Sequence, residues 1–503
     1  MKKILEKYRN YHPSKWEALS FLLIPIFLGL LTSTGTDGDI WFLMNVGKYI
    51  TNNGFFHIDP FTIHNGLYVV VQQWFIDVLF YKLHNLFGMI GIYLITNLVN
   101  TYFVYINYKL NMLISNNKRN LSVLITVITT SIVSLTFVIP RPQVFSMSIL
   151  VTELFFLEKY FKTNNSKYLI SLPILSIIMI NIHASMWLLL LCFWFPFFLN
   201  TFNYKFGKIF SKKRNRKELI IYAFLMLICG IINPYGIKAM SYILTSYTSP
   251  LLFKVVSEMQ IPDIHIVYGT IIFIIVFSIY LIYIIFNKKD IESRHFFLLI
   301  GTTYLAISSN RSILFLVISS IYPLSMYLND NFYYVKENKY NNKHLFFIIM
   351  ILFIIIPIIV VLKCNLICYR QPMKEGIDYI NKNKENSNVK IYCPYGECSY
   401  AEWVGLKPYI DSRAEVFLKS NNKKSDILEE YYDLLNGKIY YKDFLDKYDF
   451  DYLLVMERDP MYQNILHDSD YEIVYSDISL TENHKKGFGK SEIYNYYVFK
   501  AIR

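Results

Sequence analysis

Two acidic side chains stand close together just after the first long apolar run of the chain. Asp37 and Asp39 lie two positions apart in the stretch TGTDGDIW. Paired carboxylates can act as a general base or hold a divalent cation, and oxygen ligands favour Mg²⁺, Mn²⁺ or Ca²⁺ over zinc. In the alternative interpretation the acids only end a membrane helix in the headgroup region. Their spacing alone leaves both interpretations open.

Four further polar residues stand where apolar runs end. Arg141 lies in IPRPQ, His183 in INIHAS, Asn233 in INPYG and Arg311 in SSNRS. Ionisable groups at a membrane boundary cost free energy unless they face a partner or a cavity. Each one taken singly also fits a snorkelling arginine or a hydrogen-bonded interhelical histidine. Taken together they predict a site for an anionic ligand such as a lipid-linked phosphate, which arginine pairs with well.

The composition requires a membrane environment for these residues. The chain has 503 residues, of which 54% are hydrophobic and only 17% are charged. Many uncharged windows reach about 18 residues, long enough for a helix to cross a bilayer. We expect a polytopic α-helical membrane protein with about eleven spans, at 17–33, 88–107, 121–139, 143–160, 167–182, 184–202, 219–233, 268–286, 295–309, 312–328 and 345–363.

The charge distribution predicts the orientation. The net charge is +12, and most loop lysines and arginines fall in alternate short connections. By the positive-inside rule these connections and residues 1–16 are cytoplasmic, so the basic segment 208–218 is a cytoplasmic loop and not a nucleic-acid site. The other side then receives the loop 34–87, the four polar turns described above and the tail after residue 363.

The tail, residues 364–503, has the composition of a separate α/β domain outside the membrane domain 17–363. NVKIYC, DYLLVM, YEIVYSD and YNYYVFKAI are strand-like, and SDILEEYYDLLNG and MYQNILHD are helix-like. Within the loop 34–87, DIWFLMNVGKYI predicts an amphipathic helix. We expect Asp411, Arg413 and Glu415 to brace one another at a strand end, with acceptor recognition as the alternative.

The six cysteines divide into two groups. Cys192 and Cys229 lie in apolar spans, where cysteine packs as a small inert side chain. The other four are expected on the outer side, where disulfides are stable, and a local bridge between Cys393 and Cys398 is plausible. The pairing of Cys364 and Cys368 stays open.

Several motifs resemble the GT-C superfamily of polytopic glycosyltransferases. DGDIWFLMNVGKYI…GFFHIDPFT is similar to the first outer loop of bacterial members, many of them uncharacterised. The likeness continues through further short motifs over most of the chain: RPQVFS, NIHAS, NPYG, NRSILF, CSYAEWVGLKPYIDSRAEVF and KYDFDYLLV.

The resemblance implies roles for the polar residues. Asp39, or else Asp37, would be the catalytic carboxylate, and the two would hold any Mg²⁺ or Mn²⁺ that the reaction needs. Arg141 and Arg311 would stabilise the departing polyprenyl phosphate. The remaining members of the expected substrate-binding set are His183, Asn233 and Asp59. The chain departs from its relatives at Leu43, where a histidine would have been a further ligand.

The sequence therefore predicts an inverting glycosyltransferase in a bacterial cytoplasmic membrane. It would transfer a hexosyl or pentosyl group from a polyprenyl-phosphate donor to a glycan, lipid or protein of the cell envelope, at the outer face. The alternative is a non-catalytic protein that binds or translocates a lipid-linked glycan, using the arginines without the acids. A scaffold role for the tail is a third reading.

Overall fold

The computed structural model describes residues 13–36, 38–246, 249–263, 290–329, 343–371, 373–384, 388–482 and 491–502. The chain divides into two compact units. The helical unit contains Met1–Gly35, Leu86–Met240 and Ile261–Cys368, and the mixed unit contains Thr36–Asn85, Ser241–Gln260 and Tyr369–Arg503. Two short strands, β1 (Gly35–Thr36) and β5 (Cys368–Tyr369), lie where the chain passes from one unit to the other.

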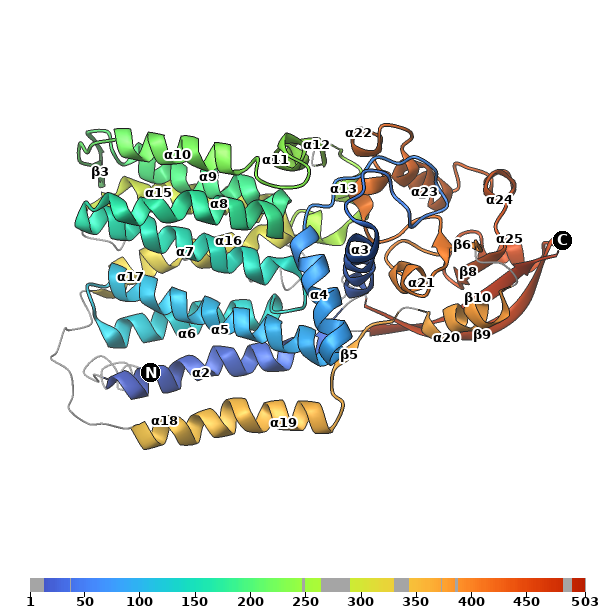
Figure 1. The fold of residues 1–503 in the computed structure, drawn as a ribbon, viewed down its shortest axis with the longest axis horizontal. Helices are drawn as coiled ribbons and strands as arrows, with labels where there is room; N and C mark the ends of the chain where they lie inside the picture. Colours follow the sequence, from blue (N-terminus) through green and yellow to red (C-terminus); the bar gives the residue numbers. More distant parts are fainter. Residues whose placement is uncertain are drawn as a thin grey trace. The chain divides into compact units, whose positions relative to one another are not determined.

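The helical unit is a bundle whose helices run alongside one another (Figure 1). Its helices are α2 (Lys15–Thr32), α5 (Met89–Ile114), α6 (Arg119–Thr136), α7 (Pro142–Thr163), η1 (Ser166–Ile170), α8 (Ser171–Ile182), α9 (Ala184–Leu199), α10 (Lys217–Cys229), α11 (Ile237–Met240), α15 (Ser293–Ser308), η4 (Asn310–Ser312), α16 (Ile313–Ser319), α17 (Ile321–Asn329), α18 (Lys343–Met350), the π-turn η5 (Ile351–Ile355) and α19 (Ile356–Lys363). Helical residues occupy every expected span except 268–286, which lies outside the described residues.

Five of these helical segments are long and apolar enough to cross a membrane within the part of the chain that the structure describes. They are Lys15–Thr32, Met89–Ile114, Arg119–Thr136, Asn310–Asn329 and Lys343–Lys363. Two shorter apolar segments, Ser166–Ile182 and Ala184–Leu199, accompany them. The multi-pass character is confirmed, while the count of eleven spans stays a prediction.

Buried polar side chains join the bundle helices to one another. Asn97 of α5 donates to the Ser33 hydroxyl at 2.7 Å, and Asn111 of α5 donates to Thr126 of α6 at 3.0 Å. Gly29 lets α2 lie close to α5, because a Cβ at this position would be only 2.1 Å from the side-chain amide nitrogen of Asn100. Such hydrogen bonds favour one helix arrangement, since hydrophobic burial does not drive association between apolar helices in lipid.

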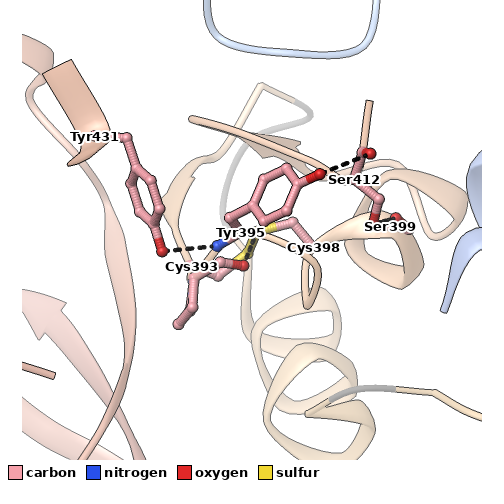
Figure 2. The surroundings of a disulfide bond; sticks show 7 residues. Cys393, Tyr395, Cys398, Ser399, Ser412 and Tyr431 are labelled. Carbon is pink, nitrogen blue, oxygen red and sulfur yellow. Dashed lines mark hydrogen bonds between the residues drawn. A yellow bond between two sulfur atoms is a disulfide. The ribbon is translucent and has the colours of Figure 1, made fainter. Parts of the chain in front are cut away.

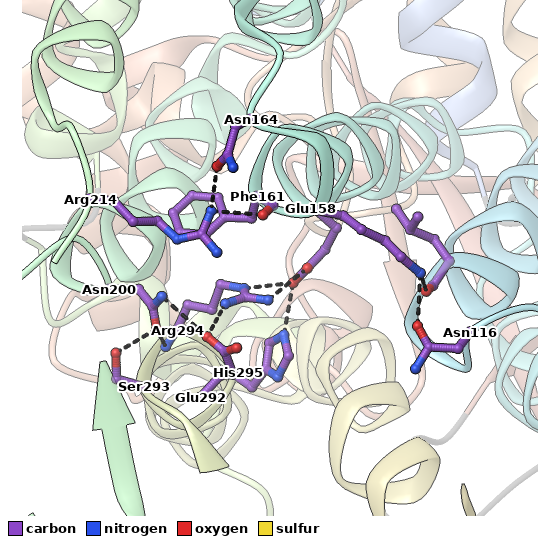
Figure 3. A network of polar contacts seen from close by, with 12 residues as sticks. Asn116, Glu158, Phe161, Asn164, Asn200, Arg214, Glu292, Ser293, Arg294 and His295 are labelled. Carbon is purple, nitrogen blue, oxygen red and sulfur yellow. Dashed lines mark hydrogen bonds and ion pairs between the residues drawn. The ribbon is translucent and has the colours of Figure 1, made fainter. Parts of the chain in front are cut away.

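A charged network closes one end of the bundle (Figure 3). Arg294 of α15 binds Glu158 of α7 through two 3.0 Å hydrogen bonds, and His295 reaches the same carboxylate at 2.8 Å. Asn200 accepts from Ser293 at 2.7 Å and from the Arg294 amide at 3.1 Å. Glu158, one of the few acids within the spans, is thus buried as an ion pair.

The residues next to this network in the sequence form a three-stranded sheet. It contains β2 (Tyr204–Phe206), β3 (Ile209–Ser211) and β4 (Ile291–Glu292) in the order β2-β3-β4. The hairpin β2–β3 is antiparallel, and β4 adds to β3 in parallel. The segment read as a cytoplasmic loop therefore contains a formed hairpin.

The mixed unit is built on a five-stranded sheet in the order β7-β6-β8-β10-β9. These strands are β7 (Lys407–Pro408), β6 (Lys390–Tyr392), β8 (Tyr452–Met456), β10 (Ser491–Ala501) and β9 (Tyr471–Glu482). Strand β6 is parallel to both neighbours, and β10 is antiparallel to both of its own. All five residues of β8 are buried, as expected for a central strand with both faces covered.

The helices of the mixed unit come from three separate segments of the chain. Those from the tail are α20 (Lys374–Asn383), α21 (Ser399–Trp403), η6 (Ala414–Phe417), α22 (Lys419–Asn422), α23 (Ile427–Leu435), α24 (Tyr441–Tyr448) and α25 (Tyr462–Leu466). The other two segments of the unit supply α3 (Asp39–Asn53), α4 (Trp74–Phe87), α12 (Tyr242–Ser246), α13 (Leu252–Val255) and η2 (Ser257–Met259). Each strand-like run of the tail contains a strand, and each helix-like run contains a helix.

The loop 34–87 packs with the tail. The Ile63 amide donates to the Pro408 carbonyl at 3.1 Å, and the Tyr68 amide donates to the Asn422 carbonyl at 3.1 Å. The His64 ring meets the Tyr409 carbonyl at 2.8 Å. The sequence treated the tail as separate from this loop, whereas in the structure the two form one compact unit with residues 241–260.

Candidate functional site

Asp39 is the first residue of α3, and Gly38 precedes it as the N-cap. A carboxylate in the first turn of a helix is stabilised by the unpaired amides and the helix dipole. The side chain is half-buried. Asp37, the other catalytic candidate, lies outside the described residues.

Two residues of the same motif hold α3 in place. Trp41 donates from its indole nitrogen to the Arg370 carbonyl at 2.7 Å and meets Tyr400 edge-on, with ring centres 5.1 Å apart. Gly47 lies against α4, because a Cβ at this position would be 2.0 Å from the Asp77 carbonyl oxygen. The tryptophan and the glycine of the motif therefore position the helix that carries Asp39.

Tyr395 lies within the electrostatic reach of four carboxylates of the mixed unit. Burial raises the pKa of its phenol well above the usual value, and the charges of Glu415, Asp39, Asp411 and Glu258 raise it further. The phenol therefore stays protonated at neutral pH and can donate a hydrogen bond. Its hydroxyl points to the Ser412 carbonyl at 3.3 Å.

A disulfide holds the loop that carries Tyr395 (Figure 2). Cys393 and Cys398 are joined with Cα atoms 5.9 Å apart, as the sequence predicted. The Tyr395 amide donates to the Tyr431 hydroxyl at 3.0 Å, so the loop is anchored on α23 as well. Cross-linking a short loop reduces the number of conformations open to it, which favours a single position for the phenol.

Arg413 is the centre of a buried charge network in the mixed unit. Its guanidinium donates to Asp59 at 2.8 Å and to Asp411 at 3.0 Å, and Glu402 lies 3.6 Å from it. Asp59 also accepts from the Thr62 hydroxyl at 3.0 Å. Asp59 therefore has a structural role as the partner of Arg413. The expectation that Asp59 binds substrate stays a prediction. Arg413 braces Asp411 as expected, in the loop that follows the short strand β7, and a part for Glu415 in this bracing stays a prediction.

The carboxyls around Arg413 differ in protonation. Burial opposes ionisation of Asp411, but the Arg413 charge and hydrogen bonds outweigh it and lower its pKa. Burial raises the pKa of Glu402 well above its usual value, helped by the nearby Asp411 charge. Burial likewise raises the pKa of Asp77, against the opposing charge of Arg413. Glu402 and Asp77 are therefore neutral carboxylic acids beside a charged pair.

In the helical unit, His183 lies in the break between α8 and α9. Its Nδ1 is 2.8 Å from the Ser146 hydroxyl, which donates to the Pro142 carbonyl at 3.1 Å. Ser146 therefore links the His183 ring to the first turn of α7. Arg311 is close enough for its charge to act on the ring. The structure thus places two predicted residues, His183 and Arg311, within electrostatic reach of each other.

The other two predicted residues of this unit have local surroundings. Arg141 is the N-cap of α7, directly before Pro142. Asn233 closes the turn between α10 and α11, because its amide donates to the Gly230 carbonyl at 2.8 Å and to the Gly236 carbonyl at 3.1 Å. Gly236 has φ +57°, a left-handed backbone that favours glycine. These contacts explain why the NPYG motif needs its asparagine and its glycine.

The described residues offer few ligands for the Mg²⁺ or Mn²⁺ ion that the sequence predicts. Among the described residues, no three His, Cys, Asp or Glu side chains come together as metal ligands. Asp39 and Glu258 both act on Tyr395 and are the oxygen donors that Mg²⁺ or Mn²⁺ prefers. These two carboxylates are an incomplete ligand set, and we derive no step through a metal.

Sequence reasoning missed Glu258 and Tyr395. Glu258 is the only acid in the segment 241–262, and that isolation was the available signal. Tyr395 gave none, because the tail is rich in tyrosine. The fold brings Asp39 and Glu258, from segments far apart in the chain, within electrostatic reach of the Tyr395 phenol.

Neither family models nor curated proteins match this sequence. Solved structures do. The oligosaccharyltransferase of Archaeoglobus fulgidus in its apo form has a TM-score of 0.57 at 12% identity, covering 88% of this chain and 70% of its own. The same enzyme tethered to an acceptor peptide has a TM-score of 0.54 at 12% identity, over 88% and 69%. AglB with an inhibitory peptide and a dolichol-phosphate has 0.55 at 11%, over 87% and 69%.

The chain thus shares the overall fold of this archaeal oligosaccharyltransferase. The multi-pass helical architecture expected from the sequence is thereby confirmed. At about 12% identity the likeness extends to the fold alone, so activity and substrates need separate support.

Proposed function

We propose that this protein is a glycosyltransferase that moves a sugar from a polyprenyl-phosphate donor to a cell-envelope acceptor, at the outer face of a bacterial cytoplasmic membrane. The observation that carries the proposal is Asp39, a half-buried carboxylate at a helix N-terminus within electrostatic reach of the Tyr395 phenol, in a chain with the fold of an oligosaccharyltransferase. AglB, which has this fold, is described with a dolichol-phosphate and with peptides, which supports a lipid-linked donor and a separate acceptor here.

The reaction we assign is an inverting displacement. The Asp39 carboxylate takes the proton of the acceptor hydroxyl or amide, and the acceptor atom bonds to the anomeric carbon from the face opposite the phosphate. The bond between that carbon and the phosphate oxygen breaks, and the phosphate leaves with the electron pair. The neutral Tyr395 phenol gives its proton to the Ser412 carbonyl, so its oxygen is left to accept a hydrogen bond from the acceptor and hold it in place.

The cationic residues of the helical unit are assigned to the leaving phosphate. Arg311 lies beside the buried His183–Ser146 pair, and Arg141 begins the helix that carries Ser146. Guanidinium groups match phosphate oxygens in geometry and stabilise the charge that develops as the bond breaks. These arginines would stabilise the leaving phosphate and take no part in the proton transfer.

A divalent cation is a secondary part of the proposal. An A. fulgidus oligosaccharyltransferase structure is described with Zn and sulfate, at a TM-score of 0.50. In this chain Asp39 and Glu258 would supply hard oxygen ligands, with Asp37 as a third acid close in sequence.

The test is transfer activity in membranes supplied with a radiolabelled polyprenyl-phosphate sugar. Asp39→Asn keeps the shape of the side chain but removes the base, and we expect a loss of about 10²- to 10⁴-fold. Asp446→Asn is the matched control, because Asp446 is an exposed acid on α24. Full activity of Asp39→Asn would refute the assignment.

A second pair of variants separates catalysis from transport. Arg311→Gln should abolish transfer and weaken donor binding, because the phosphate loses its partner. If Asp39→Asn retains all function while Arg311→Gln removes it, the protein binds or translocates a lipid-linked glycan instead. Measuring donor binding alongside transfer distinguishes the two outcomes.

A further inference from the structure

The β2–β3 hairpin of the helical unit has an unusual surface. Phe206, at the end of β2, is 80% exposed. The turn that follows contains Gly207, with φ +58°, and the exposed Lys208. Lys212 and Lys213 are exposed directly after β3. An almost fully exposed phenylalanine among lysines is costly in water and is typical of a surface that contacts an amphipathic partner.

The hairpin is fixed to the bundle and projects from it as a formed element. Its three residue pairs are Tyr204–Ser211, Lys205–Phe210 and Phe206–Ile209. The Ile291 amide of β4 donates to the Lys208 carbonyl at 2.7 Å, and the Ser211 hydroxyl donates to the Asn200 carbonyl at 2.6 Å. Asn200 belongs to the buried Arg294–Glu158 network (Figure 3).

Positive charge dominates this surface. Residues 203–217 contain seven lysines and arginines and no acid. Several of the cations also contact groups of the chain itself: Lys205 pairs with Asp290 at 2.8 Å, Arg214 donates to the Phe161 carbonyl at 2.7 Å, and Arg216 lies over the Phe202 ring, 5.0 Å from its centre. The exposed Lys208, Lys212 and Lys213 extend the charge beyond those pairs.

The helix that follows the hairpin in the chain indicates where the hairpin lies relative to the membrane. Helix α10 begins at Lys217, and apolar side chains are exposed along it, among them Ile220, Ile221 and Phe224. Exposed apolar residues on a bundle helix are those that face acyl chains. The basic hairpin therefore comes where the lipid-facing surface ends, at the depth of the headgroups.

We propose that the β2–β3 hairpin binds anionic phospholipid, with Lys208, Lys212 and Lys213 on the lipid phosphates and Phe206 inserted at the boundary of the acyl chains. Lysines at a headgroup surface attract anionic lipids, and an aromatic side chain prefers the interfacial region. Lipid is favoured over a protein partner because the hairpin is followed directly by α10, whose exposed Ile220, Ile221 and Phe224 continue the apolar surface. The proposal is independent of the transferase activity.

The charge contribution is measured with lipid spin labels on the full chain reconstituted in phosphatidylcholine. We expect spin-labelled phosphatidylglycerol to be preferred over spin-labelled phosphatidylcholine by roughly twofold or more at low salt, and the preference to fall as salt rises. The triple variant K208Q/K212Q/K213Q should lose most of it. The control K382Q/K419Q/K423Q removes three exposed lysines from the mixed unit and should keep it. Equal loss in both triples, or no preference in the unmodified chain, overturns the proposal.

The aromatic contribution is measured at residue 206 itself. A nitroxide is attached to F206C in a background where the four free cysteines, Cys192, Cys229, Cys364 and Cys368, are replaced by serine. We expect the label to collide more with oxygen, which partitions into lipid, than with a water-soluble nickel complex. The reverse ranking in bilayers containing phosphatidylglycerol would place Phe206 in water and refute the insertion.

Discussion

Removing the guanidinium of Arg413 should be among the most destabilising single changes in the mixed unit. In Arg413→Met the apolar volume is kept, but Asp59 and Asp411 lose a cation held at 2.8 Å and 3.0 Å. Both carboxylates are nearly inaccessible, at 4% and 0% exposure, so water cannot replace the lost partner. Breaking a buried pair in this way costs about 3–5 kcal/mol. The folded-to-unfolded ratio should therefore fall by roughly two to four powers of ten.

The loss should depend on pH in a defined direction. Arg413 lowers the pKa of Asp411 in the folded protein, so the pair contributes stability above the unfolded pKa of about 4, and this is lost as pH falls through the folded value. Without Arg413 the buried carboxylates must take up protons to stay buried, which becomes harder as pH rises. The difference between the two proteins should be larger at pH 8 than at pH 5.

The assay is guanidinium unfolding of the full chain in detergent, with brief proteolysis at each denaturant concentration to follow fragments of the mixed unit. Lys382→Met is the control, because Lys382 is an exposed cation on α20 of the same unit, and it should change stability by less than about 0.5 kcal/mol. The reasoning fails if the two variants unfold at the same denaturant concentration. It also fails if the Arg413→Met loss is the same at pH 5 and pH 8.

Three further outcomes are expected. Asp77→Asn should stabilise the protein more at pH 8 than at pH 5 in the same unfolding assay, because burial raises the carboxyl pKa and folding at high pH requires proton uptake; a gain that shrinks as pH rises would contradict this. Reducing the Cys393–Cys398 disulfide with dithiothreitol should lower the turnover number for transfer more than it raises the KM for the donor, because the Tyr395 loop loses its constraint; equal activity before and after verified reduction would contradict it. Gly47→Ala should lower stability by about 1–3 kcal/mol or more in thermal melts, because its Cβ would overlap the α4 backbone, whereas Gly301→Ala meets no neighbour within 4 Å and should not; similar melting temperatures would contradict this.

Much of the local structure was predictable because it depends on short-range patterns. The strand-like runs of the tail alternate or are wholly apolar, and they became β6, β8, β9 and β10. The Cys393–Cys398 bridge was predictable for the same reason, since its ends are five positions apart in the chain. The overall fold was predictable only through the resemblance of several short motifs.

The pairing of distant charges could not be predicted. Arg413 and Asp59 are 354 positions apart, and no feature of the sequence around either residue predicts that the two form a pair. The DPF motif suggested a ligand-binding acid, whereas the structure shows Asp59 buried against an arginine of the tail. A buried ion pair and a binding site use the same residue types, so composition alone cannot separate them.

The spacing of the first-loop motif has a physical explanation in the helix that it forms. Trp41 and Gly47 are six positions apart, which at about 100° per residue places them roughly 240° apart around α3. They therefore contact different neighbours: Trp41 packs against Tyr400 of α21, and Gly47 lies against the backbone of α4. A helix held on two sides cannot rotate about its axis without losing one contact. Because Asp39 is the first residue of that helix, the two contacts together set the direction of its carboxylate, and this is why the motif needs the tryptophan and the glycine as well as the acid.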